Sequence, residues 1–148
     1  MALFEDFLPY LIVKLAHELT QDLILELKRE GVNLVRWRIL AALASKDGST
    51  ISEIGARAMM QQSALSRMLM VMETEGYLTR RLRRTDERWV EVCLTPRGRK
   101  QFETLNVVVR RRQDRFLAGF SNEEIKATFS HLERMSHNVR RRPPARGS

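Results

Sequence analysis

The sequence predicts a mainly α-helical protein with one small β hairpin. Apolar residues recur at the helical spacings of three and four over most of the 148 residues. At residues 77–95 the pattern changes, and two short β-prone runs flank an arginine-rich tip. The first long helix is expected to end at Gly31, and its apolar stripe comprises Leu8, Leu11, Ile12, Leu15, Leu19, Leu23 and Leu27.

Two shorter helices are expected to form a tight pair before the hairpin. Ser52 and Glu53 would begin a helix running through Ala58, and a turn at residues 59–61 leads to a longer helix closing at Gly76. Two helices joined by such a turn make the helix-turn-helix arrangement, in which Gly55, without a Cβ, lets the second helix approach closely. The apolar side of the second helix carries Leu65, Met68, Leu69 and Met72, and its outer side carries Gln62, Ser63, Ser66 and Arg67.

Further helices are expected on both sides of this region. Asn33 can cap one that contains Trp37, Thr95 can cap a long one after the hairpin, and Ser121 with Glu124 forms a capping box for the last. The first and last helices each carry an apolar stripe that one small chain can cover only partly. The sequence therefore favours a two-fold homodimer whose interface involves both termini.

The charge of the chain makes a polyanion the first partner to consider. The formal net charge is +8, which suits nucleic acid or an anionic membrane surface. The hairpin favours double-stranded DNA, because its arginines can neutralise phosphates and release counterions. The alternative is that they only form a solvated face, and both interpretations also apply to the arginines at 110–112. The hairpin arginines are Arg80, Arg81, Arg83, Arg84 and Arg88.

The second helix of this tight pair, which closes at Gly76, carries groups on its outer side that can read DNA. Gln62 can pair with adenine, serine hydroxyls donate or accept, and Arg67 can bind guanine or a phosphate. The alternative is an ordinary amphipathic surface helix.

Several functional classes are not expected. The single cysteine, Cys93, excludes an intramolecular disulfide framework, and no Cys/His spacing suits zinc. No catalytic constellation, metal site or cofactor motif is present, so an enzyme is not expected. Charged residues interrupt the apolar run at residues 3–19, so neither a signal peptide nor a membrane segment is expected, and a cytoplasmic protein follows.

The chain resembles the multiple-antibiotic-resistance-regulator (MarR) family over nearly its full length. The resemblance is carried, in the family order, by Trp37-Arg38-Ile39-Leu40, Ile51-Ser52-Glu53-Ile54-Gly55, Ser63-Ala64-Leu65-Ser66-Arg67-Met68-Leu69, Glu73-Thr74-Glu75-Gly76-Tyr77-Leu78, Asp86-Glu87-Arg88 and Leu94-Thr95-Pro96-Arg97-Gly98. It implies a winged helix-turn-helix homodimer that binds a palindromic operator, usually as a repressor released by a small ligand or an oxidant.

The resemblance also implies roles for segments and residues. Residues 1–32 and 96–140 would be dimerisation helices, residues 33–95 the winged helix-turn-helix domain, and residues 141–148 a disordered basic tail. Residues 61–75 would be the recognition helix, contacting DNA through Gln62, Ser63, Ser66 and Arg67. Arg88 would enter the minor groove, oriented by Asp86, and Arg83 and Arg84 would hold the backbone or groove edge. Gln61, Met70 and Val71 depart from the family pattern, which usually has a capping Asp and charged residues there.

The effector is the least defined part of the interpretation. The family pocket, carried over, would include His17, Trp37 and Arg38, and an aromatic ring with a cation suits an aromatic or phenolic ligand. Trp37 as a core residue and His17 as a solvated one are the alternatives. A redox-responsive regulator of the same fold using Cys93, or a non-specific nucleic-acid binder, are the alternative functions.

Overall fold

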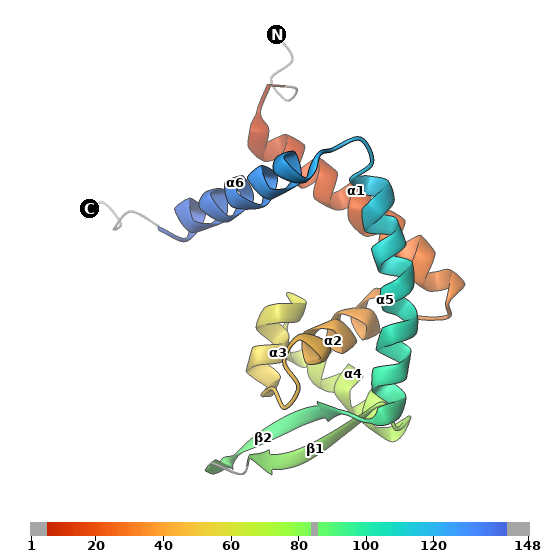
Figure 1. Ribbon diagram of the computed structural model, residues 1–148. Helices are drawn as coiled ribbons and strands as arrows, with labels where there is room; N and C mark the ends of the chain where they lie inside the picture. Colours follow the sequence, from red (N-terminus) through yellow and green to blue (C-terminus); the bar gives the residue numbers. More distant parts are fainter. Residues whose placement is uncertain (1–5, 84–85, 142–148) are drawn as a thin grey trace, which may run out of the picture. The chain divides into compact units, whose positions relative to one another are not determined.

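The computed structural model describes residues 6–83 and 86–141, without the side chains of residues 83–88. Its elements confirm the predicted fold class, a mostly helical chain with a two-stranded antiparallel wing (Figure 1). The chain forms two compact units, residues 1–110 and residues 111–148. The elements are α1 (Leu8–Arg29), α2 (Leu34–Ser45), α3 (Ile51–Ala58), α4 (Gln62–Thr74), β1 (Leu78–Arg83), β2 (Asp86–Leu94), α5 (Pro96–Phe116) and α6 (Asn122–Arg140).

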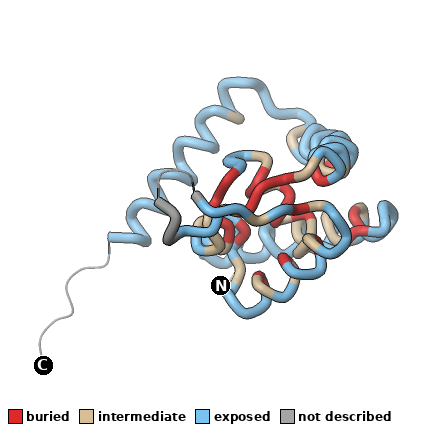
Figure 2. Tube along the Cα trace, turned by 90° about the horizontal axis from the view of Figure 1, so that it is seen from below, coloured by how far each residue is buried: buried red, intermediate tan, exposed pale blue. Residues whose placement is uncertain are grey.

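The core of the first unit is built around α2. This helix contacts α1, α3, α4 and β2, and the buried residues gather there (Figure 2). The Trp37 ring on α2 stacks on Phe102 of α5, with the centroids 5.7 Å apart and the planes 6° from parallel. This stack packs the first half of α5 against α2. The fully buried apolar residues are Leu27, Ile39, Leu40, Leu43, Ile54, Leu65, Leu69, Met72 and Val92.

Local capping sets most helix ends, as the sequence predicts. The Asn33 side chain accepts a hydrogen bond from the backbone N–H of Arg36 at 2.8 Å, and Thr95 Oγ1 accepts one from Gly98 N at 3.1 Å. The predicted N-cap of α3 is wrong. Thr50, and not Ser52, is its N-cap, because the Thr50 hydroxyl faces the Glu53 N–H while Ser52 lies inside the first turn.

The hairpin forms a short antiparallel ribbon on this core. Leu78 pairs with Leu94, and Leu82 pairs with Val90 further toward the tip. Leu78 and Leu94 are buried and anchor the base of the ribbon. Leu82 lies on the same face of β1 as Leu78, because every second residue of a strand faces the same way, but it is exposed beyond the core. A single bridge between Ser49 and Val92 adds the loop before α3 to the ribbon.

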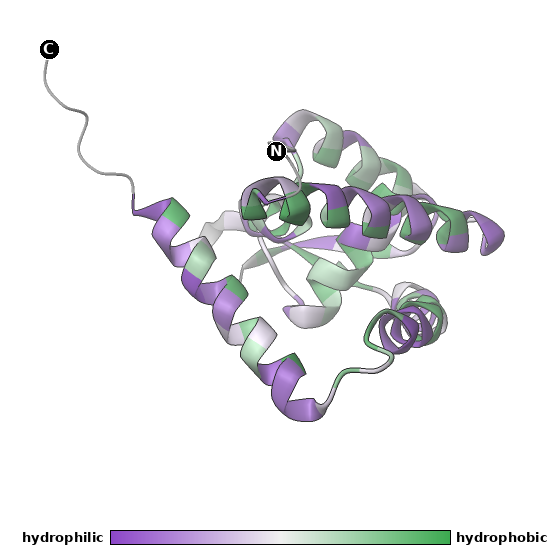
Figure 3. Ribbon diagram, turned by 90° about the horizontal axis from the view of Figure 1, so that it is seen from above, coloured by the Kyte–Doolittle hydropathy of each residue, from purple (hydrophilic) through white to green (hydrophobic). Residues whose placement is uncertain are grey.

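The second unit contains the end of α5 and all of α6. The capping box predicted for α6 is present, since Ser121 and Glu124 each accept a hydrogen bond from the other's backbone N–H. Apolar residues recur along α6 in the helix leading to the C-terminus (Figure 3), yet almost the whole helix is exposed in the single chain. Within the first unit, the N-terminal half of α1 is exposed in the same way.

Candidate nucleic-acid interface

The turn between α3 and α4 places α4 against the core. Met59 ends α3 in the left-handed conformation, at φ 52°, and Met60 N donates to Gly55 O at 3.0 Å. Gly55 does lie at the contact with α4, as predicted. A Cβ placed on it would meet Leu65 Cδ2 at 3.4 Å, however, so the site is close-packed without requiring glycine.

The outer face of α4 presents the predicted reading residues. Leu65, Leu69 and Met72 are fully buried, which turns the opposite side of the helix outward. Ser63 and Arg67 are exposed on that side, Ser66 is half-buried, and Gln62 is exposed at the first position of the helix. Gln61 makes no capping hydrogen bond with its side chain, so it does not cover the first-turn N–H groups of α4. Such groups attract phosphate at a helix N-terminus.

Two of the hairpin arginines form ion pairs within the chain. Arg80 Nε lies 3.1 Å from Glu73 Oε2 of α4, and Arg81 Nε lies 3.4 Å from Glu91 Oε2 on the paired strand. The first pair ties the ribbon to α4, and the second links its two strands. The spacing of charges in the sequence could not show this, because Glu73 and Glu91 lie on other elements.

The remaining hairpin residues lie at the edge of what the structure describes. Arg84 is outside the described residues. Arg83, Asp86 and Arg88 have described backbone in β1 and β2, where Arg83 pairs with Asp86, but their side chains are outside the described part. Their roles therefore remain predictions.

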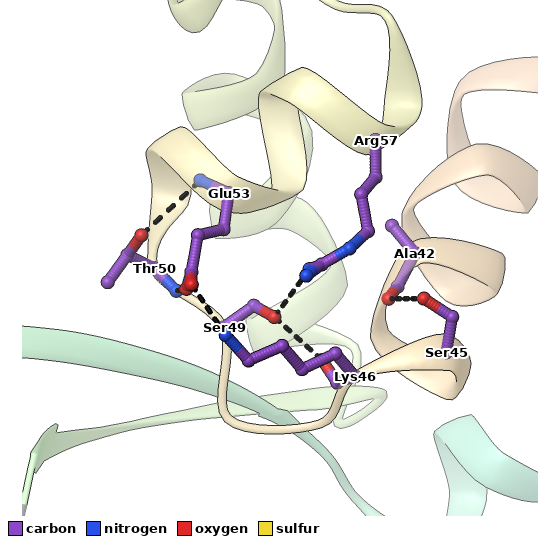
Figure 4. Close-up of polar contacts among 7 residues, drawn as sticks. All are labelled: Ala42, Ser45, Lys46, Ser49, Thr50, Glu53 and Arg57. Atoms are coloured by element: carbon purple, nitrogen blue, oxygen red, sulfur yellow. Dashed lines mark hydrogen bonds and ion pairs between the residues drawn. The ribbon is translucent and has the colours of Figure 1, made fainter.

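A polar network joins the end of α2 and the loop that follows it to α3 (Figure 4). The buried Ser49 hydroxyl donates to Lys46 O at 2.7 Å and accepts from Arg57 Nη1 at 2.9 Å. Lys46 Nζ also donates to Glu53 Oε1 at 2.6 Å. This contact, with the Thr50 backbone N–H that Glu53 accepts, lowers the pKa of Glu53 to about 2.

The exit from α4 is held by a cluster that sequence reasoning missed. The guanidinium carbons of Arg97 and Arg36 lie 4.5 Å and 5.1 Å from the centroid of the Tyr77 ring. Arg36 also pairs with Glu75, and Arg97 Nη1 donates to Glu75 O at 2.8 Å. The cluster fixes the end of α4 to α2 and α5. Its members are far apart in the sequence, so no local pattern indicates it.

The predicted effector residues occupy different environments. Trp37 is buried in its stack with Phe102, Arg38 is half-buried on α2, and His17 is exposed on α1. In this state the indole has little surface left for a ligand. Their role as a pocket remains a prediction.

Cys93 lies where its sequence context suggests. It is buried on β2, and burial raises the pKa of its thiol above the ordinary value. A thiolate is therefore disfavoured near neutral pH.

Within the described part of the chain, no three His, Cys, Asp or Glu side chains gather as a metal site would require. None of the helices in residues 6–83 and 86–141 combines the length and hydropathy needed to cross a membrane.

Comparison with known proteins gives this fold a family. The MarR family model matches residues 30–88, which contain α2, α3, α4, β1 and the start of β2. A MarR family transcriptional regulator from Silicibacter pomeroyi is 31% identical in sequence, with a TM-score of 0.83 over 94% of both chains. The chain belongs to the MarR family of transcriptional regulators.

One further relative and one protein of the same fold extend the comparison. The HTH-type transcriptional repressor IacR of Pseudomonas putida is 27% identical over 135 residues, covering 91% of this chain and 81% of IacR. The fold is shared with CouR from Rhodococcus jostii RHA1 bound to p-coumaroyl-CoA, at 15% identity and a TM-score of 0.81 over 91% and 95% of the chains. It is also shared with CouR bound to a 23-mer DNA duplex, at 20% identity and a TM-score of 0.78 over 92% and 96%.

Proposed function

We propose that this MarR family regulator is a repressor that binds a palindromic operator as a homodimer and releases it on binding a small ligand. The observation that carries the DNA-binding part is the outer face of α4. There Ser63 and Arg67, four residues apart, are exposed on one side of the helix beside an arginine-rich ribbon, and Gln62 is exposed at the first helical position, on a chain of net charge +8. CouR, which shares the fold, binds a DNA duplex.

In the proposed complex, α4 lies in the major groove and the hairpin extends toward the minor groove. Arg67 binds a guanine edge or a phosphate. Arg88 enters the minor groove, Asp86 orients it, and Arg83 and Arg84 hold the phosphate backbone. Residues 33–95 thus form the DNA-binding domain of the proposal.

Selection of bound genomic fragments, followed by fluorescence anisotropy at several salt concentrations, tests this proposal. A specific site should emerge, and its affinity should fall steeply with salt. Arg67→Ala should weaken binding, and it should also relax base preference if the side chain reads a base. Arg88→Ala should weaken binding without unfolding the protein.

A matched control is available on α1. Arg29 has a side chain that is 74% exposed and pairs only loosely with Glu26, at 3.4 Å. Arg29→Ala removes the same charge and should leave affinity nearly unchanged. Equal losses for Arg29→Ala and Arg67→Ala would reduce the effect to net charge and contradict specific reading by α4.

The homodimer is proposed from apolar surface that the single chain leaves exposed. In α1 this surface includes Leu8, Leu11 and Leu15, and in α6 it includes Phe129 and Leu132. Residues 1–32 and 96–140 are the proposed dimerisation segments. Sedimentation equilibrium should give twice the chain mass of 17.3 kDa, and Leu132→Glu should lower it. A monomer that binds the operator with full affinity would contradict the proposal.

Ligand release is proposed from the carried-over pocket residues His17, Trp37 and Arg38. CouR is bound to p-coumaroyl-CoA, an aromatic acyl thioester. A ligand acts by favouring a dimer whose recognition helices are wrongly spaced for the operator, which needs only differential affinity. Aromatic carboxylates and their thioesters should be titrated against the operator complex and into a transcription assay. Unchanged operator affinity at saturation would reject each compound, and activation of transcription by the bound protein would contradict repression.

A further inference from the structure

The outer face of α4 carries two exposed large apolar side chains, Met70 and Val71, among its polar ones. Met70 is 55% exposed and follows Ser63 by seven residues, Ser66 by four and Arg67 by three. These spacings place all four residues on one side of a helix. Met70 is therefore part of the face that we propose as the reading surface, one turn beyond Arg67.

The end of α4 offers little else on this side. Thr74 follows Met70 by four residues, but its hydroxyl donates to the Met70 carbonyl oxygen at 3.0 Å. Its donor is thus used inside the helix. Beyond Arg67, the thioether chain of Met70 is the main group that this face presents.

We propose that Met70 contacts the methyl group of a thymine in the major groove, so that operator recognition has an apolar part. This inference rests on the DNA-binding function proposed above. Thymine is the base that displays a methyl group in the major groove, and apolar side chains read it there. A methionine chain is flexible enough to adapt to such a contact.

The geometry of α4 allows Met70 to reach a base. It lies eight residues after Gln62, which at 1.5 Å per residue is about 12 Å along the helix axis. The major groove is also about 12 Å wide. With Gln62 at one side of the groove, Met70 is still within it at the other side.

The polar surroundings favour DNA over a protein partner for this side chain. Arg67 is exposed beside Met70, and exposed Thr74 lies beyond it. The other large apolar side chain exposed on α4 is Val71, so the apolar surface is two neighbouring side chains within a polar and cationic face. A protein-docking helix would present several apolar residues in a row. Continuity with the row of Ser63, Ser66 and Arg67 indicates a polyanion as the occupant.

Deoxyuridine in place of thymine tests the contact, because it removes only the methyl group. Each thymine of the selected operator is replaced in turn, and affinity is measured by anisotropy. For the natural protein, one position per half-site should lose roughly fourfold in affinity, the value of one buried methyl. Met70→Ala should bind the thymine operator more weakly and show no loss at that position, whereas Met70→Leu should keep the loss.

Val71 provides the matched control. It is 47% exposed on the same helix and borders the row, since it follows Arg67 by four residues. Consecutive helical residues are about 100° apart, so it points away from the direction of Met70. Val71→Ala should keep the deoxyuridine effect. Thermal unfolding and sedimentation of each variant show that fold and mass are retained.

The outcomes separate this inference from the function on which it rests. Specific operator binding with no deoxyuridine effect at any position overturns the role of Met70 and leaves the function intact. A deoxyuridine effect that persists in Met70→Ala, or a changed dimer mass in that variant, also overturns it. Failure to select any specific site overturns the proposed function itself.

Discussion

The backbone of Gly98 packs directly against the carbonyl group of Tyr77. A Cβ placed on Gly98 would overlap the Tyr77 oxygen and lie 3.1 Å from the carbonyl carbon. Leu94 Cδ2 would be 3.2 Å away on another side. The first turn of α5 can therefore sit on the exit of α4 only if residue 98 has no side chain.

Gly98→Ala should lower the free energy of unfolding by on the order of 3 kcal/mol, because backbone atoms cannot yield as a side chain can. Chemical denaturation measures this. Gly55→Ala is the control. Its Cβ would meet Leu65 Cδ2 at 3.4 Å, and the cost of this close contact offsets the gain of about 1 kcal/mol in helix propensity that alanine has over glycine. This variant should be close to neutral. Equal losses in both variants would contradict the assignment of the tight contact to Gly98.

The start of α3 gives a second prediction. Thr50→Ala removes the cap that faces Glu53 N and should lower the free energy of unfolding by about 1 kcal/mol. Ser52 is exposed inside the first turn, so Ser52→Ala should change it little. Urea denaturation of the two variants decides between them, and a larger loss for Ser52→Ala would restore the cap that the sequence suggested.

The parts of the fold that follow from local chemistry were predictable. The Asn33, Thr95 and Ser121 caps involve contacts within three residues, so a sequence window contains both partners. The predicted cap of α3 was wrong for a local reason. Thr50 and Ser52 are both acceptable N-cap residues, and the geometry of the loop determines which of them caps the helix.

The contacts that the sequence did not indicate depend on partners from other elements. Arg80 and Arg81 look like free cations in sequence, and the fold brings a carboxylate to each. The cluster around Tyr77 requires Arg36 from α2 and Arg97 from α5. These two side chains come together only because the core packs α5 against α2. The exposed row on α4 was predictable because burial of Leu65 and Leu69 fixes it by helical periodicity alone.

Cys93 gives a prediction about oxidants. Burial raises the pKa of its thiol, so the reactive thiolate is scarce and shielded. The folded protein should react slowly with thiol reagents and quickly in urea, and peroxide should leave operator affinity unchanged. Cys93→Ala should behave like the natural protein in this assay. Loss of DNA binding in peroxide that Cys93→Ala does not show would instead support the redox-responsive alternative.

Glu53 should make stability depend on pH in the acid range. The Lys46 ammonium and the Thr50 N–H lower its pKa from 4.5 to about 2 in the folded chain. A lowered folded pKa means that the unfolded chain binds the proton first. The stabilisation is therefore complete above pH 4.5 and is lost as the pH falls from 4.5 toward 2. Because the side chain is 32% exposed, solvent screening makes the gain smaller than the shift alone implies.

The comparison with Glu53→Gln isolates this contribution from other carboxyl groups. Urea denaturation between pH 7 and pH 2 should give curves that differ most above pH 4.5 and converge toward pH 2. Lys46→Met removes the largest cause of the shift, so the pKa of Glu53 should rise toward its ordinary value. The acid-induced loss should then still begin near pH 4.5, but it should be smaller and should finish at higher pH. Parallel curves for the natural protein and Glu53→Gln over this whole range would contradict a charged Glu53 held by Lys46 and Thr50.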